Sequence, residues 1–562
     1  MSQAIAALNY SLFYPGRKLP EQPLGLIIGY NIEEVILTMV ALRNSLERNR
    51  YDFLRDSLVL SIINKLPANK AQRLRNFLAR DQGFGLVHGV VITKILVDLF
   101  KALGLNNPTL DIGEGDYEEK LFDLILVYNE YHYSNLLDDG APDTHELVWA
   151  LMMMQTISGM GEVNYARTGS IKHLIFLQFL KESLGRDFKK LEDSLKENVG
   201  LSTVYQFLGI FITLFYHVTK KNEPTLLLPQ ISDEDPNYPY LALMNLVIDK
   251  ELATNRNFDI GTLLTHPFFK TSDGKTYLLD HKDFSLLSER VFIYLLYSKT
   301  NILNLINKKD LNGLLAHIGL NYYEKYLLHR LLKSLERPGL RVVASEDQLL
   351  SDFTMIVNET DVFVIEVKSV AMNYRVFVQQ NHHGFKKYID DKFCDEKGVP
   401  QLARNIGYLR ADRANLLNLR KPANKLNIYP IIVFTEPQIS TYAVNDYVGE
   451  KANLEFEKLA GDFKEIRPLT MIHSDFFVEN IELLNRDRAL LKKLINDYHA
   501  SNYRKRQRYN KFKSTENYVR SMVDFDRYAI GKKGVYRVDQ KKIFEHLTSV
   551  FRLKQNPEEK AS

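Results

Sequence analysis

Apolar residues recur at helical spacing through most of the first 222 residues, with polar breaks between the runs. This pattern predicts helices over these segments: 32–49, 51–66, 88–103 and 171–184. Clusters of turn-forming residues fall near 106–108 and 138–142. We find no repeat of fixed period, so the pattern predicts a large helical N-terminal region that serves recognition, regulation or assembly.

A proline-bearing acidic connector at 221–239 follows this region. Beyond it, the apolar spacing predicts a helix over 240–254 and another over 283–297. Between them, two short aromatic and apolar runs flank Asp273 and Gly274, which is a strong hairpin signal. The connector, the hairpin and the helices therefore lead from the helical N-terminal region into a region with strand-like patterns.

Alternation of period two is clearest across residues 352–368. Glu366 and Lys368 share one face of the second predicted strand with two valines, whereas three apolar residues share the other face. The turn at 358–361 folds the first strand back alongside, which places Asp352 near the charged end of its partner. Opposite charges at the end of an apolar strand are costly to bury unless a cation or substrate compensates them.

Carboxylates on adjacent strands form a hard oxygen site, which suits Mg²⁺ or Mn²⁺ and disfavours zinc. We expect Asp352, Glu366 and the carbonyl of Val367 to hold the metal. The ammonium of Lys368 is then placed to orient an attacking water or to stabilise charge on a phosphate.

Helical and strand patterns flank this hairpin on both sides. A helix over 320–335 and a strand over 340–344 precede it, and a helix with Gln401 in its first turn precedes a strand over 428–434. The predicted order is therefore helix, three strands, helix and strand. The crossover helix makes the last strand parallel to its neighbour.

This order of elements, with its acids and lysine, resembles the PD-(D/E)xK superfamily of restriction-endonuclease-like phosphodiesterases. The resemblance implies an αβββαβ core over 318–440, with the family's Asp, Glu and Lys roles on Asp352, Glu366 and Lys368. Ser351 stands where the motif's name carries proline.

Two further residues gain roles from the resemblance. It implies that Glu324 is a second metal or water ligand; the alternative is a helix-terminal acid favoured by the macrodipole. Gln401 would contact phosphate or a metal-bound water, or it is an ordinary polar residue at a helix start. Some members carry tyrosine four residues after this glutamine, whereas this chain has Asn405.

The composition is that of an ordinary soluble protein of several domains: 562 residues, 45% hydrophobic and 25% charged. The single cysteine, Cys394, excludes a disulfide framework and favours the cytoplasm. The start lacks the pattern of a signal peptide.

We interpret the apolar runs at 147–157 and 204–218 as buried helices, because both are short for a bilayer. The glycines at 159–170 lack the lysine of a P-loop.

Near the end of the chain, a helix predicted over 475–500 precedes a densely basic segment at 503–520. We expect nucleic-acid contacts from its basic and aromatic side chains: Arg504, Lys505, Arg506, Arg508, Lys511, Lys513 and Tyr509. The alternative is a solvated helix face. Because the net charge is only +4, any affinity for nucleic acid must come from such local patches. His473 and Asp475 follow a predicted strand at 469–472, and we assign them no role.

These patterns predict a multidomain α and α/β protein with four regions: a helical N-terminal domain (1–222), a connector with a hairpin (223–317), the nuclease core (318–440) and a helical basic region (441–562). The hypothesis is a cytoplasmic Mg²⁺- or Mn²⁺-dependent endonuclease acting on DNA, by analogy a restriction or anti-phage defence effector. The alternatives are an RNA-cleaving effector and a non-catalytic nucleic-acid-binding protein. A homodimer or a partner defence protein is a further expectation, and a membrane is not.

Overall fold

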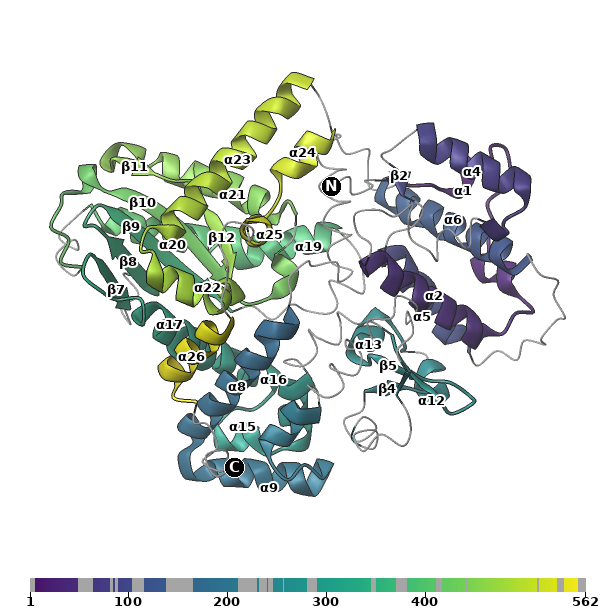
Figure 1. Cartoon of the computed structure of the whole chain (residues 1–562), viewed down its shortest axis with the longest axis horizontal. Helices are drawn as coiled ribbons and strands as arrows, with labels where there is room; N and C mark the ends of the chain where they lie inside the picture. The colour runs from purple at the N-terminus through teal and green to yellow at the C-terminus, as the bar shows by residue number, and fades with distance from the viewer. Residues whose placement is uncertain are drawn as a thin grey trace. The chain divides into compact units, whose positions relative to one another are not determined.

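Figure 1 shows the computed structural model of the chain. It describes the following residues: 6–48, 64–80, 84–85, 89–103, 116–137, 165–210, 230–231, 240, 246–255, 257–279, 291–344, 350–369, 382–410, 417–440, 442–512, 515–532 and 540–553. The chain divides into two compact units of mixed helix and strand. The first comprises Met1–Met160, Gly209–Val291 and Phe377–Asn381; the second comprises Gly161–Leu208, Phe292–Val376 and His382–Ser562. The division into four regions that the sequence patterns predict stays a prediction.

In the first unit, amphipathic helices pack through their apolar faces. The helices include α1 (Tyr10–Phe13), α2 (Ile32–Arg48), α4 (Ala68–Arg80), α5 (Gly89–Ala102) and α6 (Asp116–Leu137). The helices predicted over 32–49 and 88–103 are confirmed, whereas most of 51–66 lies outside the described residues. The short strands β1 (Ala6–Ala7) and β2 (Phe84–Gly85) pair in parallel.

A four-stranded sheet also belongs to the first unit, in the order β3-β6-β5-β4. Its strands are β3 (Gln230–Ile231), β4 (Val247–Ile248), β5 (Phe268–Lys270) and β6 (Thr276–Leu278), and the short helices α12 (Lys250–Ala253) and α13 (Ile260–Thr265) lie between β4 and β5. The predicted hairpin is confirmed as the antiparallel β5–β6 pair. Gly274 in its turn has a φ of 86°, which glycine adopts at little cost.

The helix predicted over 240–254 is wrong. Val247 and Ile248 form strand β4, which pairs in parallel with β5. The side chain of Asp249 then accepts a hydrogen bond from the N–H of Leu252 and caps the short helix α12. An apolar pair before a capping aspartate therefore favours a strand that meets a helix start, rather than one continuous helix.

The second unit is built around a six-stranded mixed sheet, whose strands are labelled β7 to β12 in Figure 1. The strands β7 (Leu340–Ala344), β8 (Phe353–Val357) and β9 (Asp361–Lys368) form an antiparallel meander. Strand β10 (Asn427–Phe434) runs parallel to β9, and β11 (Glu465–Ile466) and β12 (Thr470–His473) run parallel to β10. The order of helix, three strands, helix and strand is observed with one helix more than predicted, because both α19 (His382–Ile389) and α20 (Val399–Tyr408) lie between β9 and β10.

Helices pack on this sheet and next to one another in the second unit. They include α8 (Tyr165–Leu184), α9 (Phe188–Val199), α15 (Ile302–Leu305), α19 (His382–Ile389), α20 (Val399–Tyr408), α21 (Val444–Glu457), α24 (Thr515–Ser521), α25 (Phe525–Gly531) and α26 (Gln540–Phe551). The predicted helix over 171–184 is confirmed as part of α8.

The helix predicted over 320–335 has a different start. Helix α16 (Leu311–His317) continues into a π-helix, η4 (Ile318–Leu328), and then into α17 (His329–Lys333). The side chain of Asp310 accepts a hydrogen bond from the N–H of Gly313 and begins the helix there. Residue 320 therefore lies inside a longer helical segment.

The helix predicted over 475–500 is two helices, α22 (Ser474–Arg486) and α23 (Leu490–Phe512). Asp487 interrupts them with an extended backbone, and its carboxylate accepts a hydrogen bond from the N–H of Ala489. Aspartate competes for backbone donors in this way, which explains the break in a run that is otherwise helical in pattern.

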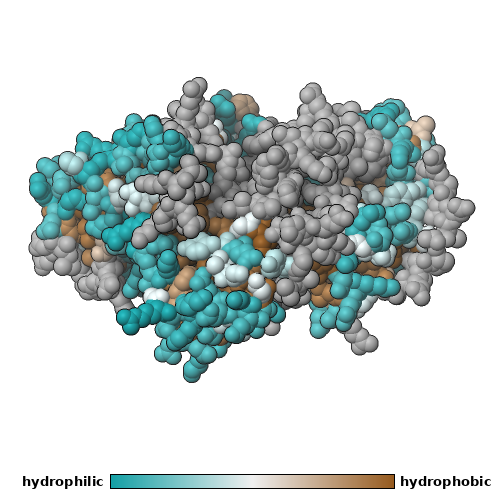
Figure 2. Space-filling view, turned by 60° about the horizontal axis from the view of Figure 1, so that its bottom comes forward, coloured by the Kyte–Doolittle hydropathy of each residue, from teal (hydrophilic) through white to brown (hydrophobic). Residues whose placement is uncertain are grey.

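None of the helices among the described residues combines the length and apolar character needed to cross a membrane. The segment 147–157 lies outside the described residues. On the face shown in Figure 2, much of the described surface is hydrophilic, with hydrophobic residues in smaller areas.

The centre of the large sheet supports a stability prediction. The ring of Phe363 on β9 is fully buried and stacks on Tyr429 of β10, with ring centroids 4.6 Å apart. We expect Phe363→Ala to lower the free energy of unfolding by about 3–5 kcal/mol in denaturant titrations. Phe512→Ala is the matched control, because that ring is 65% exposed, and it should change the value by about 0.5 kcal/mol or less. Equal effects of the two substitutions would contradict this placement of the core.

Candidate active site

The carboxylates predicted to converge at the end of the β8–β9 ribbon do so. Phe353 pairs with Ile365, so the next position outward sets Asp352 opposite Glu366. Oδ2 of Asp352 accepts a hydrogen bond of 2.7 Å from the N–H of Val367. The bond fixes the aspartate, which directly precedes β8, against the end of β9.

Lys368 joins this pair to a helix. Its Nζ donates to Oε1 of Glu366 at 2.8 Å and to Oε1 of Gln401 at 3.0 Å. Gln401 lies in the first turn of α20, which begins after Gly398 at a φ of 65°. A Cβ at Gly398 would lie 2.6 Å from the carbonyl oxygen of Phe393, so only glycine allows this close approach.

Burial raises the free energy of the ionised Glu366 side chain. The residue is only 1% exposed, and its Oε2 has no hydrogen-bond partner. Burial first, and the neighbouring charge of Asp352 second, raise the pKa of Glu366 to about 8. Burial also raises the pKa of Asp352, although its hydrogen bond from Val367, the charge of Lys368 and a hydrogen bond from the protonated side chain of Glu366 oppose the rise. A shared proton or a bound cation removes the cost of holding two such acids side by side.

Glu324 approaches the same cluster from the π-helix η4. Burial, and then the charge of Asp352, raise its pKa to about 7. The helical segment begins at Leu311, so Glu324 is not in a first turn, and the interpretation as a helix-terminal acid is wrong. π-Helical turns are rare and occur frequently at functional sites.

Sequence reasoning missed the residue that brings this helix close. A Cβ at Gly319 would lie 2.1 Å from Oγ of Ser369 and 3.1 Å from its Cβ. Glycine therefore lets η4 touch the chain directly after β9. A glycine inside a helical pattern is a known signal of close packing, so Gly319 could have predicted this contact from the sequence.

The donor set fits a hard divalent cation with few protein ligands. Among the residues that the structure describes, no three or more His, Cys, Asp or Glu side chains are grouped to hold a metal ion. The pair of Asp352 and Glu366 nevertheless offers oxygen donors, one of them buried and without a partner. Mg²⁺ typically keeps several waters and takes one or two carboxylates, so a pair suffices. The roles of Glu324 and of the Val367 carbonyl as ligands stay predictions.

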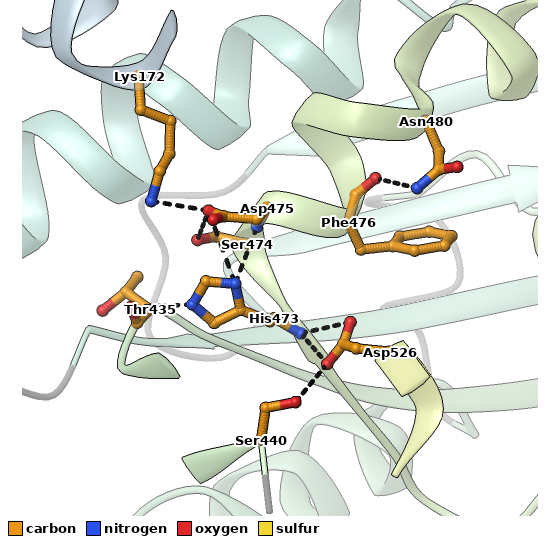
Figure 3. A network of polar contacts seen from close by, with 9 residues as sticks. All are labelled: Lys172, Thr435, Ser440, His473, Ser474, Asp475, Phe476, Asn480 and Asp526. Carbon is orange, nitrogen blue, oxygen red and sulfur yellow. Dashed lines mark hydrogen bonds and ion pairs between the residues drawn. The ribbon is translucent and has the colours of Figure 1, made fainter. Parts of the chain in front are cut away.

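A second polar cluster lies at the ends of the neighbouring strands (Figure 3). Nε2 of His473 lies 3.1 Å from the carbonyl oxygen of Thr435, and Nδ1 accepts a hydrogen bond from the N–H of Asp475. These bonds fit a neutral imidazole with its proton on Nε2. Nζ of Lys172, from α8, lies 2.7 Å from Oδ1 of Asp475, and both side chains are buried. These bonds tie His473 to the end of β10 and to the start of α22.

The basic residues predicted to bind nucleic acid fall into two groups. Arg506 pairs with Asp446 at 2.7 Å, Lys505 donates to the carbonyl of Arg520, and Tyr509 packs on Tyr518. The other group, Arg504, Arg508 and Lys511, is exposed. Lys513 lies outside the described residues.

Comparison of the chain with protein-family models, with curated proteins and with solved structures found no match in any of the three. The candidate site therefore rests on its own geometry.

Because Glu366 is buried, we predict that a neutral side chain at this position stabilises the folded protein at high pH. Its pKa is higher in the folded state, so the folded protein holds a proton that the unfolded chain releases, and the contribution of Glu366 to stability falls as pH rises from 4.5 to about 8. In metal-free buffer, Glu366→Gln should raise the free energy of unfolding by about 1–3 kcal/mol at the upper end of this window. The gain should vanish at the lower end. A variant less stable than the wild type at both ends would contradict the cost assigned to this carboxylate.

The Lys172–Asp475 pair makes a separate prediction. Lys172→Met leaves a buried carboxylate without its cation and should cost about 3–5 kcal/mol in thermal or denaturant unfolding. Adding Asp475→Leu removes the unpaired charge and should recover more than half of that loss. If the double variant is as unstable as the single one, the ion pair is not the source of the effect.

Proposed function

We propose that this chain is a metal-dependent nuclease that hydrolyses phosphodiester bonds in DNA on a restriction-endonuclease-like core. One observation carries the proposal: when Glu366 is ionised, its buried Oε2 has no hydrogen-bond partner, although it lies beside Asp352 and within the reach of a lysine. A cluster that served the fold alone would be expected to satisfy its buried acceptors. An unsatisfied carboxylate oxygen is a cost that a ligand can remove.

Asp352 and Glu366 would hold Mg²⁺ or Mn²⁺, with Glu324 near enough for its charge to act on Glu366. When bound, the ion would neutralise these acids and stabilise the negative charge that develops on a phosphate. Oxygen donors alone favour these ions over zinc.

Lys368 would be the side chain that acts on the substrate. Two acceptors, Glu366 and Gln401, fix its ammonium between strand β9 and helix α20. An ammonium in this position can donate to a phosphate oxygen or hold a water in line for attack. Gln401 acts through Lys368 and is a positioning residue. Some members of the family that the chain resembles carry tyrosine four residues after this glutamine, whereas this chain has the buried Asn405. The hydrogen bond from Lys368 to Gln401 forms despite this difference.

The biological setting stays a hypothesis. A restriction or anti-phage defence role is an analogy from the size of the chain, and no contact in the structure depends on it. An RNA substrate is distinguished from DNA by direct competition between labelled strands. A non-catalytic scaffold would bind nucleic acid and leave it intact in Mg²⁺ and Mn²⁺.

Separate measurements of metal binding and cleavage test the proposal. Titration calorimetry with Mn²⁺ should show binding to the wild type and to Lys368→Met, and little or none to Glu366→Gln. With plasmid, linear or single-stranded DNA and Mg²⁺, both variants should lose about a hundredfold or more of the cleavage rate, because each lacks a group needed for the transition state.

The matched control is Glu359→Gln, in the turn of the same ribbon, where the carboxylate is part-exposed and pairs with Arg341. It should bind Mn²⁺ and cleave like the wild type. The proposal is wrong if Glu366→Gln binds and cleaves as well as this control, or if wild-type protein leaves every DNA substrate intact.

A further inference from the structure

Helix α23 presents two different faces along its length. One face packs within the second unit through Tyr498, which is 2% exposed, and through the Arg506 ion pair with Asp446. In Figure 1 this half of the helix extends beyond the strands, with α24 beside it. The inner contacts hold the helix in place, so the outer face is rigidly presented.

The outer face carries a stripe of three cations, Arg504, Arg508 and Lys511, which we call the basic stripe. Their spacing of four and three residues places them on one side of the helix, over about 10 Å of its axis. All three are exposed, and none forms an ion pair with a described acidic residue. The ring of Phe512 borders the stripe, with Nζ of Lys511 5.1 Å from its centroid.

Positive charge is crowded here beyond the stripe itself. Burial first, and then the charges of Arg520 and Lys532, lower the pKa of Lys505 on the adjoining side of the helix. Seven Lys or Arg residues and one Glu lie between residues 503 and 520, in a chain whose whole net charge is +4. Like charges gathered on a rigid element cost free energy, and an anionic partner removes that cost.

We infer that the basic stripe is a docking surface for the phosphate backbone of duplex DNA. Three exposed cations in a row match a partner that carries a regular line of negative charges, and a rigid helix needs no ordering on binding. The inference deepens the proposed function, because it names the surface that would hold the substrate away from the reacting phosphate. It concerns binding alone, and so it can fail or hold independently of cleavage.

Fluorescence anisotropy with a labelled duplex of about 30 base pairs, in EDTA so that no cleavage occurs, tests this surface across a range of KCl concentrations. The variant carries Arg504→Gln, Arg508→Gln and Lys511→Gln in the full chain. We expect its affinity to fall about tenfold or more at roughly 0.1 M KCl. The slope of log K against log salt should fall by about 3, one for each lost phosphate contact.

The matched control removes three exposed lysines from helix α9 of the same unit: Lys189→Gln, Lys190→Gln and Lys196→Gln. It should keep the wild-type affinity within about twofold, and circular dichroism should show both variants folded. If the stripe variant binds like this control, or if its salt slope is unchanged, the inference is wrong. Tight, stripe-dependent binding by a protein that cuts no DNA would leave the inference standing and overturn the proposed function.

Discussion

The burial of one carboxylate, that of Glu366, is the constraint on which the rest of the site depends. It sits at the end of an apolar strand with one oxygen bonded to Lys368 and the other without a partner. Asp352 stands across the ribbon and adds a second negative charge. Folding must supply the free energy that keeps these groups together, and the well-packed sheet around Phe363 and Tyr429 is where that free energy arises.

Three separate elements converge on this carboxylate. The β8–β9 ribbon places the acids and the lysine, and α20 adds the acceptor of Gln401. The π-helix η4 carries Glu324, and its Gly319 lies close to Ser369, directly after β9. Hydrogen bonds and close backbone contacts position each of these elements relative to the others.

The sequence predicted local features well where one physical signal dominated. Alternation of period two predicted the β8–β9 ribbon, and the Asp-Gly turn predicted the β5–β6 hairpin. Helix boundaries were harder, because side-chain caps at Asp249, Asp310 and Asp487 compete with the helical pattern.

Contacts between distant segments were not predictable from the same patterns. The ion pair of Lys172 with Asp475 joins residues 303 positions apart. The signal for it in the sequence was a lysine inside an apolar helical run. Likewise, periodicity could not show that Arg506 faces inward while Arg504 and Arg508 face outward. The most direct test of the account is a crystal of the protein soaked in Mn²⁺. The account predicts an anomalous peak between the carboxylates of Asp352 and Glu366, and no peak there, with both side chains ordered, would contradict it.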